Sequence, residues 1–145
     1  MTYIDRLSEL KTAFARLKEA IPEVKNQLDK DGVIQRFEFV FELVWKTMKD
    51  YAEDMGRLDT ASPKDAFRVA ADLGLIQDPL IWFDFLKSRN EAAHLYDEVK
   101  AEGVFQQIPD FIISVENLIV KLEKNWPMDE LKNKTIILAS SLNFL

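Results

Sequence analysis

The sequence predicts an all-α protein that folds as an up-down bundle of four principal helices with one extra short helix. Glycine occurs only 4 times and proline 5 times in 145 residues, which suits long helices better than turn-rich β-sheets. Hydrophobic residues make up 48% of the chain and recur at helical spacing. The length fits one domain, which we place at residues 1–126, with residues 127–145 as a C-terminal tail to which no pattern assigns a structure.

The first two helices follow from apolar spacing. Large apolar side chains of the first segment recur every three or four residues, at Ile4, Leu7, Leu10, Phe14, Leu17 and Ile21. This spacing predicts an amphipathic helix, which Pro22 interrupts. The aspartates and glycine of residues 29–32 predict a break. The second helix is then expected at about Val33–Asp54, with Gly56 placed to end it.

Helix start signals place the remaining elements. Ser62–Pro63 is a strong N-terminal signal for a short helix that stops at Gly74. Asp78–Pro79 is a second start signal of the same kind and begins a predicted helix of about twenty residues. The last helix is expected at about Val104–Lys124, with Pro109 near its first turns.

Composition and motifs exclude several classes of function. The chain has no cysteine, which excludes disulfides, a thiolate nucleophile and cysteine-based zinc sites. One histidine with scattered carboxylates is no zinc signature, and no P-loop, G-x-G-x-x-G or G-x-S-x-G occurs. We therefore expect neither a metal nor a cofactor.

Charge and hydropathy limit the partners and the location. The net charge of −6 argues against broad nonspecific binding to nucleic acid and leaves only a local basic patch for an RNA contact. The charged, amphipathic N-terminus does not look like a signal peptide. No apolar run approaches the ~20 residues of a membrane span, so we expect a cytoplasmic protein that does not bind membranes.

The stretch "SRNEAAHLYDE" contains the most suggestive polar residues, including His94, the only histidine in the chain. On a helix Asn90 and His94 share one face, and Arg89 and Tyr96 share another. Arg89 lies about 140° around the helix from His94, so one straight helix cannot direct both at one point. Either the helix bends here, or a second copy of the chain supplies the missing groups across a two-fold axis.

Two interpretations of this stretch remain open from the residues alone. RNA cleavage without a metal needs an acid and a base, for which histidine is suited near neutral pH, and arginine stabilises charge on phosphate. Arg89 and His94 could fill these roles, and Asn90 could orient the imidazole or hold a phosphate oxygen. The alternative is a solvated helix face with an ordinary ion pair between Lys87 and Glu91, four residues apart.

The segment "RFEFVFELVWKTMKDY" contains a second polar feature. Glu38, Glu42 and Lys46 form a column at four-residue spacing, which is either a groove for a nucleotide or partner protein or an exposed helix stripe. Phe39 falls on the more polar side of the same helix. An exposed aromatic side chain often marks an interface, so we expect a homodimer.

These two segments resemble a known family. "RNEAAHLY" is similar to the R-x4-H motif of the HEPN superfamily of small all-α proteins, in the extended R-x4-H-x-Y form of toxins paired with minimal nucleotidyltransferases. "RFEFVFELVWKTMKDY" and the following "SPKDAFRVAADLGLI" resemble the branch named nucleotidyltransferase substrate-binding proteins. The resemblance covers about residues 3–125 and implies a bundle that dimerises with the motif at or near its interface.

The resemblance also implies a partner, a small nucleotidyltransferase, and two views of function. In one view the protein is the toxin of a toxin–antitoxin pair, a metal-independent ribonuclease. Arg89 and His94 are then catalytic, Asn90 is supportive, and the partner silences the toxin by transferring AMP to Tyr96. In the other view the protein is a non-catalytic subunit that binds a nucleotide or substrate for the nucleotidyltransferase.

Overall fold

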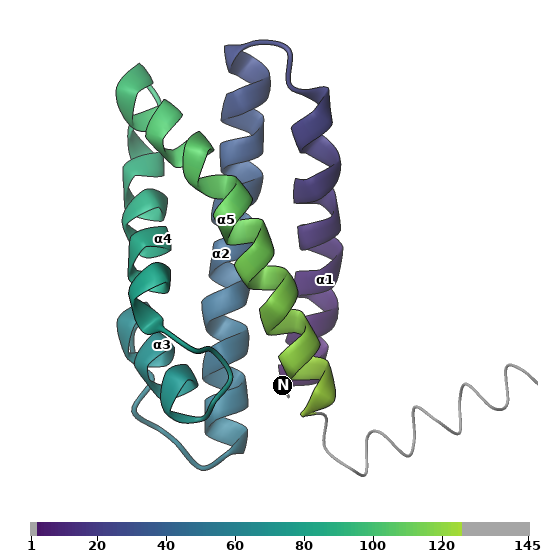
Figure 1. Ribbon diagram of the computed structural model, residues 1–145, viewed down its shortest axis with the longest axis vertical. Helices are drawn as coiled ribbons and strands as arrows, with labels where there is room; N and C mark the ends of the chain where they lie inside the picture. The colour runs from purple at the N-terminus through teal and green to yellow at the C-terminus, as the bar shows by residue number, and fades with distance from the viewer. Residues whose placement is uncertain (1–2, 126–145) are drawn as a thin grey trace, which may run out of the picture.

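The computed structural model describes residues 3–125, which form five α-helices and two short 3₁₀-helices with no strand among them. Helices α1 (Tyr3–Ala20) and α2 (Gln27–Asp54) form an antiparallel pair, joined through the 3₁₀-helix η1 (Ile21–Glu23) (Figure 1). The apolar face predicted for the first helix is largely the face that α1 buries, including Leu7, Leu10, Phe14 and Leu17.

The other elements complete the bundle around α2. The short α3 (Pro63–Asp72) packs against α2 and α4 (Pro79–Glu91), and the 3₁₀-helix η2 (Ala92–His94) continues α4. Helix α5 (Glu98–Lys124) crosses the bundle diagonally in Figure 1 and contacts α1, α2 and α4. The prediction of an up-down bundle with four principal helices and one short helix is confirmed.

Helix α2 begins at Gln27 rather than near Val33, so the predicted break at residues 29–32 was wrong. The side-chain oxygen of Asn26 accepts a hydrogen bond from the backbone N–H of Asp29 at 2.9 Å and caps the helix. Gly32 therefore lies inside the helix, where glycine costs only about 1 kcal/mol relative to alanine. The cap and the burial of the following turns outweigh that cost.

The region between α4 and α5 also differs from the prediction. The expected helix of about twenty residues was wrong, because α4 ends after 13 residues, at Glu91. Asp97 caps the next helix by accepting hydrogen bonds from the backbone N–H groups of Val99 at 3.0 Å and Lys100 at 3.2 Å. Helix α5 consequently begins at Glu98 rather than near Val104, and Pro109 lies in its interior.

The helix signals around α3 are confirmed. The hydroxyl of Ser62 accepts a hydrogen bond from the backbone N–H of Asp65 at 3.2 Å, with Pro63 at the first position. Gly56 and Gly74 follow the ends of α2 and α3 with φ angles of 86° and 75°, a left-handed conformation that glycine adopts without strain.

Aromatic rings connect four helices through the centre of the bundle. Phe37 of α2 meets Phe111 of α5 with ring centroids 4.8 Å apart, and Phe85 of α4 meets the same ring at 5.2 Å. Trp82 of α4 continues the contacts to Phe67 of α3 at 5.7 Å. Because all five side chains are buried, these rings hold α4 in a defined position against α2 and α5.

The two ends of the described chain are joined. The Tyr3 hydroxyl donates a hydrogen bond to the backbone oxygen of Asn125 at 2.9 Å, and its ring meets Tyr51 edge to face at 5.2 Å. The predicted tail at residues 127–145 lies outside the described residues. None of the helices in residues 3–125 is long and apolar enough to cross a membrane.

Candidate active site at the end of helix α4

The R-x4-H-x-Y motif spans the point where helix α4 ends. Arg89 and Asn90 lie in its last turn, whereas His94 is the last residue of η2 and Tyr96 lies in the following turn. The backbone N–H of Asp97 donates to the carbonyl oxygen of His94 at 2.9 Å and closes this turn. Of the two arrangements that the helix geometry left open, a break in the helix is therefore present, and the angular offset of a straight α-helix no longer applies.

Arg89 lies against helix α2. Its Nη1 is 2.8 Å from Oε1 of Glu42, and its guanidinium carbon lies 5.2 Å from the centroid of the Phe41 ring. The side chain of Arg89 is 30% exposed, but its Nε is buried and has no hydrogen-bond partner among the described residues. An unsatisfied buried donor is uncommon and costs about 1–3 kcal/mol, so the ion pair satisfies the guanidinium only in part.

Glu42 is the point where the two polar features of the sequence meet. Its Oε2 accepts a hydrogen bond from the indole N–H of Trp45 at 3.1 Å, and the Nζ of Lys46 is 3.9 Å from the same oxygen. The column on α2 and the motif on α4 were predicted as separate features, and Arg89 joins them. Trp45 was missed as a polar partner, although a donor three residues after Glu42 is a signal that the sequence contains.

Glu38 adds a second carboxylate near Arg89. Partial burial raises the pKa of Glu38 above its ordinary value of 4.5, and the positive charge of Arg89 offsets part of that increase. Arg89 therefore interacts with two carboxylates of α2, one turn apart, and burial raises the pKa of one of them.

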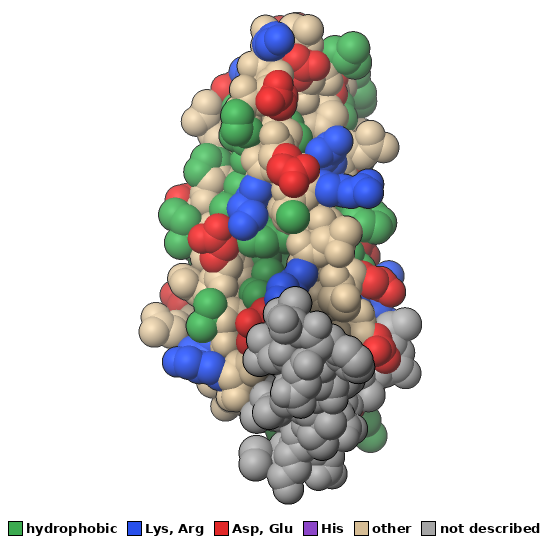
Figure 2. Space-filling model, turned by 90° about the vertical axis from the view of Figure 1, so that its right-hand side faces the viewer, with side chains coloured by type: hydrophobic (Ala, Val, Ile, Leu, Met, Phe, Trp, Pro, Cys, Tyr) green, Lys and Arg blue, Asp and Glu red, His purple; other side chains and the backbone are tan. Residues whose placement is uncertain are grey.

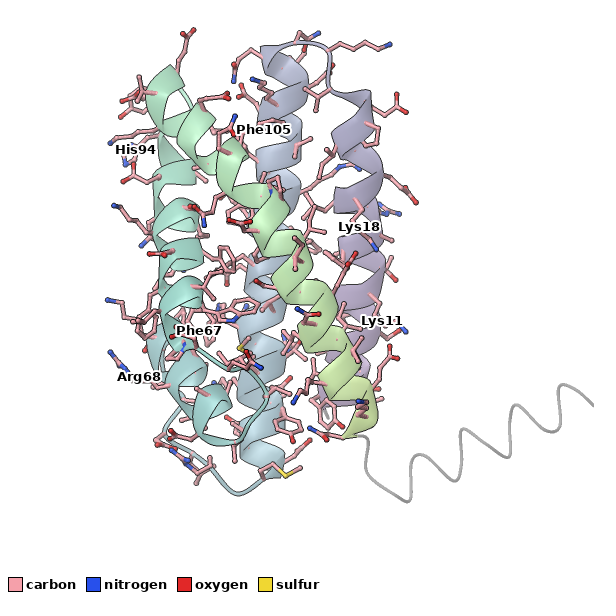
Figure 3. All side chains as sticks on the ribbon, viewed as in Figure 1. Lys11, Lys18, Phe67, Arg68, His94 and Phe105 are labelled. Atoms are coloured by element: carbon pink, nitrogen blue, oxygen red, sulfur yellow. The ribbon has the colours of Figure 1, made fainter. Side chains whose placement is uncertain are left out.

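His94 and Tyr96 form a pair at the surface. Nδ1 of His94 lies 3.0 Å from the Tyr96 hydroxyl, and the two rings meet edge to face with centroids 5.7 Å apart. The Tyr96 side chain is 84% exposed and His94 is partly buried. Figure 3 shows His94 projecting outward at the end of α4 that is remote from α3.

The structure brings the motif together only in two halves. Within residues 3–125, no hydrogen bond or ion pair joins Arg89 to His94 or Tyr96, and Asn90 is exposed with no side-chain hydrogen bond. The predicted ion pair between Lys87 and Glu91 was wrong. Glu91 lies 3.6 Å from Lys100 of α5 instead, because α5 begins early enough to bring that lysine beside it.

The side chains at this end of α4 are suited to acid–base chemistry and anion binding. An imidazole can accept or donate a proton near neutral pH, and a guanidinium stabilises negative charge on phosphate. No group of three or more histidine, aspartate or glutamate side chains in the described part of the chain is arranged to bind a metal ion.

Comparison with known proteins identifies the family. The family described as "Nucleotidyltransferase substrate binding protein like" matches residues 5–124. The chain belongs to this family. The resemblance inferred from the two sequence segments is confirmed at that level, and the matched range includes both of them.

Relatives and solved structures agree with this assignment. A Haemophilus influenzae protein named "Probable ribonuclease HepT" is 34% identical over 134 residues, covering 81% of this chain and 92% of that protein. A crystal structure of a Thermus thermophilus protein has a TM-score of 0.73 and 33% identity, covering 78% of this chain and 98% of that one.

A second solved structure, from Haemophilus influenzae, is described as revealing the fold of a substrate binding domain of a nucleotidyltransferase. It has a TM-score of 0.74 and 31% identity, covering 81% of this chain and 98% of that one.

Proposed function

We propose that this protein is a metal-independent ribonuclease, the toxin of a pair with a small nucleotidyltransferase that silences it by transferring AMP to Tyr96. The observation that carries the proposal is the composition of the α4 end. It combines a hydrogen-bonded His94–Tyr96 pair with a guanidinium that its protein partners satisfy only in part. The name of the Haemophilus influenzae relative, "Probable ribonuclease HepT", supports the same activity.

In the proposed reaction, a base removes the proton of a ribose 2′-hydroxyl, whose oxygen attacks the adjacent phosphorus. The bond from phosphorus to the 5′-oxygen breaks, an acid protonates that oxygen, and a 2′,3′-cyclic phosphate remains. The imidazole of His94 acts as acid or base, Arg89 stabilises the negative charge on the phosphate, and Asn90 holds a phosphate oxygen.

A symmetric dimer would supply two imidazoles to one reaction, one as base and one as acid. The exposed apolar side chains near the motif support such a contact: Phe39 is 64% exposed, Tyr96 84% and Val99 83%. Large apolar side chains left exposed often mark a protein interface. The two halves of the motif, which do not meet in one chain, would then be completed by the second copy.

Transfer of AMP to Tyr96 is consistent with the local geometry. When Nδ1 of His94 accepts the phenolic proton, the Tyr96 oxygen becomes a better nucleophile for the α-phosphorus of ATP, and pyrophosphate leaves. The product removes the hydroxyl that contacts His94 and adds a phosphate anion beside the imidazole. The added anion would repel RNA, and the AMP group would block the acid–base group of His94.

RNA cleavage by the purified protein tests the proposed function. We expect wild-type protein to cleave RNA in the presence of a chelator, and both Arg89→Ala and His94→Ala to lose that activity. Coexpression with the nucleotidyltransferase should add the mass of AMP to wild-type protein and none to Tyr96→Phe. The ribonuclease assignment fails if wild type and His94→Ala leave RNA equally intact.

A second candidate function is a non-catalytic subunit that binds a nucleotide or other substrate for the nucleotidyltransferase. Three observations favour a binding subunit: the ion pair between Arg89 and Glu42, the acidic net charge, and the description of the second solved structure. Calorimetry with the nucleotidyltransferase separates the two candidates. A tight complex of unmodified protein without RNA cleavage supports the binding subunit, and the absence of a complex at micromolar concentration excludes it.

A further inference from the structure

The outer face of helix α4 forms a stripe that leads toward the motif. At 100° per residue, Phe83, Lys87 and Asn90 fall within about 60° of one another around the helix axis. The stripe continues beyond Asn90 toward His94 in the 3₁₀ turn. From Phe83 to Asn90 it spans about 10 Å along the axis, on the order of three stacked nucleotides at 3.4 Å each.

Helix α3 adds two cations at the far end of this stripe. The Nζ of Lys64 lies 5.9 Å from the centroid of the Phe83 ring, and the guanidinium carbon of Arg68 lies 5.3 Å from it. Phe83 is only partly buried, and its inner side meets Phe67 at 6.2 Å. Figure 3 shows Arg68 and His94 projecting from the same edge of the bundle, the edge formed by α3 and α4.

The two lysines of this edge lack the carboxylate partners that several other lysines of the described bundle have. Lysines of α1 and α2 pair with glutamates of α5, as Lys11 does with Glu123 at 2.7 Å. On the side shown in Figure 2, positive and negative side chains accordingly alternate. Lys64 and Lys87, by contrast, have no carboxylate partner among the described residues.

Three carboxylates moderate the positive charge of this edge. Arg68 is 3.4 Å from Asp65, but both side chains are about half exposed, and ion pairs of this kind contribute little. Asp84 is exposed and lies about 100° around α4 from Phe83, on the flank of the stripe. Glu91, one turn after Lys87, is 3.6 Å from Lys100 of α5. The acids of this edge therefore do not exceed its cations, in a chain with a net charge of −6.

We propose that Lys64, Arg68, Phe83 and Lys87, which we call the α3–α4 edge, bind single-stranded RNA and lead it to Asn90 and His94. This inference rests on the proposed ribonuclease function and adds the surface that selects and orients the substrate. The lysines contact the phosphates, while the Arg68 guanidinium, which lies over the partly buried Phe83 ring, provides a flat surface on which a base stacks.

A single strand fits this edge better than a duplex or an acidic protein does. Exposed aromatic and guanidinium planes recognise unstacked bases, which a duplex does not present. An acidic protein would use the cations, whereas a single strand also uses the flat guanidinium that lies over the ring. The stripe also ends at the motif, where the proposed reaction needs an RNA strand to arrive.

The test measures RNA binding by the His94→Ala protein, which retains the edge and lacks the proposed catalytic group. The probe is a fluorescein-labelled, unstructured RNA of about 12 nucleotides, within the usual range for single-strand sites. Each phosphate contact contributes about 0.7 to the slope of log affinity against log salt. Lys64→Gln with Lys87→Gln should therefore reduce the slope by about 1.4 and weaken binding roughly 10- to 30-fold at 0.1 M salt.

A matched control removes two other unpaired lysines, Lys25→Gln with Lys124→Gln, and changes the net charge equally. This control should keep the slope and lose affinity less than about threefold, through the long-range field alone. Phe83→Leu should weaken binding about fivefold or more, and Phe83→Tyr should restore it because stacking is retained. Thermal melting of every variant checks that the bundle is intact.

The outcomes separate this inference from the proposed function. Binding that responds equally to the two lysine pairs, or no RNA binding by the His94→Ala protein, overturns the α3–α4 edge even if wild type cleaves RNA. Binding that depends on the edge, without cleavage by wild type, supports the edge and overturns the ribonuclease. If the edge variants weaken only the complex with the nucleotidyltransferase, the surface is a protein interface and the inference is wrong.

Discussion

Helix α2 forms two ion pairs with arginines of neighbouring helices, and the two differ in how well they satisfy the arginine. Arg6 of α1 places its Nε 2.6 Å from Oδ2 of Asp50, with side chains 24% and 13% exposed. Arg89 of α4 reaches Glu42 through Nη1 at 2.8 Å, with side chains 30% and 36% exposed, and its Nε has no partner in the described part of the chain.

The difference indicates two purposes for the same chemistry. The Arg6–Asp50 pair connects two helices that are adjacent in sequence and leaves no buried side-chain atom of either residue unsatisfied in the described region. The Arg89–Glu42 pair lies at the end of a helix, beside a 3₁₀ turn and an exposed tyrosine. Proteins tend to accept incomplete satisfaction where a group has work beyond stability.

Replacing Arg89 with lysine should produce the largest effect and the clearest contrast between the pairs. We expect RNA cleavage to fall about 10²- to 10³-fold, because lysine lacks the planar fork that stabilises phosphate charge. Single-turnover cleavage rates measure the change. Arg6→Lys is the matched control and should retain wild-type cleavage, and an equal loss in both variants would contradict the distinction.

Replacing Arg6 with alanine should show that the Arg6–Asp50 pair contributes more to stability than the Arg89–Glu42 pair does. We expect the free energy of unfolding to fall by about 1–3 kcal/mol, since the change leaves Asp50, 13% exposed, without its partner. Arg89→Ala should cost less, about 1 kcal/mol, because it also removes the unsatisfied buried Nε of Arg89, and Oε2 of Glu42 keeps its contacts with Trp45 and Lys46. Urea unfolding measures both. A larger loss of unfolding free energy in Arg89→Ala than in Arg6→Ala would contradict the structural role of the Arg6–Asp50 pair.

Neutralising Glu42 tests whether its ion pair restrains Arg89. In Glu42→Gln the carboxylate no longer competes with the RNA phosphate for the Arg89 guanidinium. RNA should therefore bind roughly fivefold more tightly, which corresponds to the ~1 kcal/mol of a solvent-accessible ion pair. Cleavage at saturating RNA should fall, because Arg89 loses the group that orients it. Asp50→Asn is the corresponding control and should change neither quantity. Weaker RNA binding by Glu42→Gln would show that the ion pair does not restrain Arg89.

The smallest expected effect concerns Glu38 and pH. Because its pKa is raised in the folded protein, the folded state binds a proton more tightly than the unfolded state does. The contribution of Glu38 to stability is therefore fully present below its ordinary value of 4.5 and declines as pH rises through the raised value.

Urea unfolding of wild type and Glu38→Gln measures this contribution. The stability of wild type relative to the variant should decrease as pH rises above 4.5. The same comparison for Asp50→Asn provides a carboxylate outside the site. A pH-independent difference for Glu38→Gln would show that burial near Arg89 does not alter its titration.

Much of the fold could be predicted because local signals and tertiary packing agree. Ser62 and Asp78 cap helices where the sequence indicated, and Gly56 and Gly74 follow helix ends with positive φ angles. The errors occurred where a cap was overlooked. Asn26 and Asp97 start α2 and α5 earlier than periodicity suggested, because side-chain hydrogen bonds at a helix start outweigh a glycine or a charged turn.

The candidate site was predictable in its members and less so in its geometry. The sequence identified Arg89, His94 and Tyr96 and the column at Glu42, but it placed the two features apart. It also gave no polar role to Trp45, whose partly buried indole donates to Glu42. Contacts between α2 and α4 join residues about fifty positions apart, and helical periodicity contains no information on which faces meet.

By itself the sequence determined an all-α bundle, the family to which it belongs and the residues able to handle protons and phosphate. These follow from spacing, caps and side-chain chemistry, which are local properties. Only the tertiary structure decided that α4 ends at Glu91, that His94 turns to Tyr96, and that Arg89 reaches Glu42. Those outcomes depend on where the packed aromatic core places α4 against α2. Burial of residues far apart in the sequence determines this position, and no local sequence pattern specifies it.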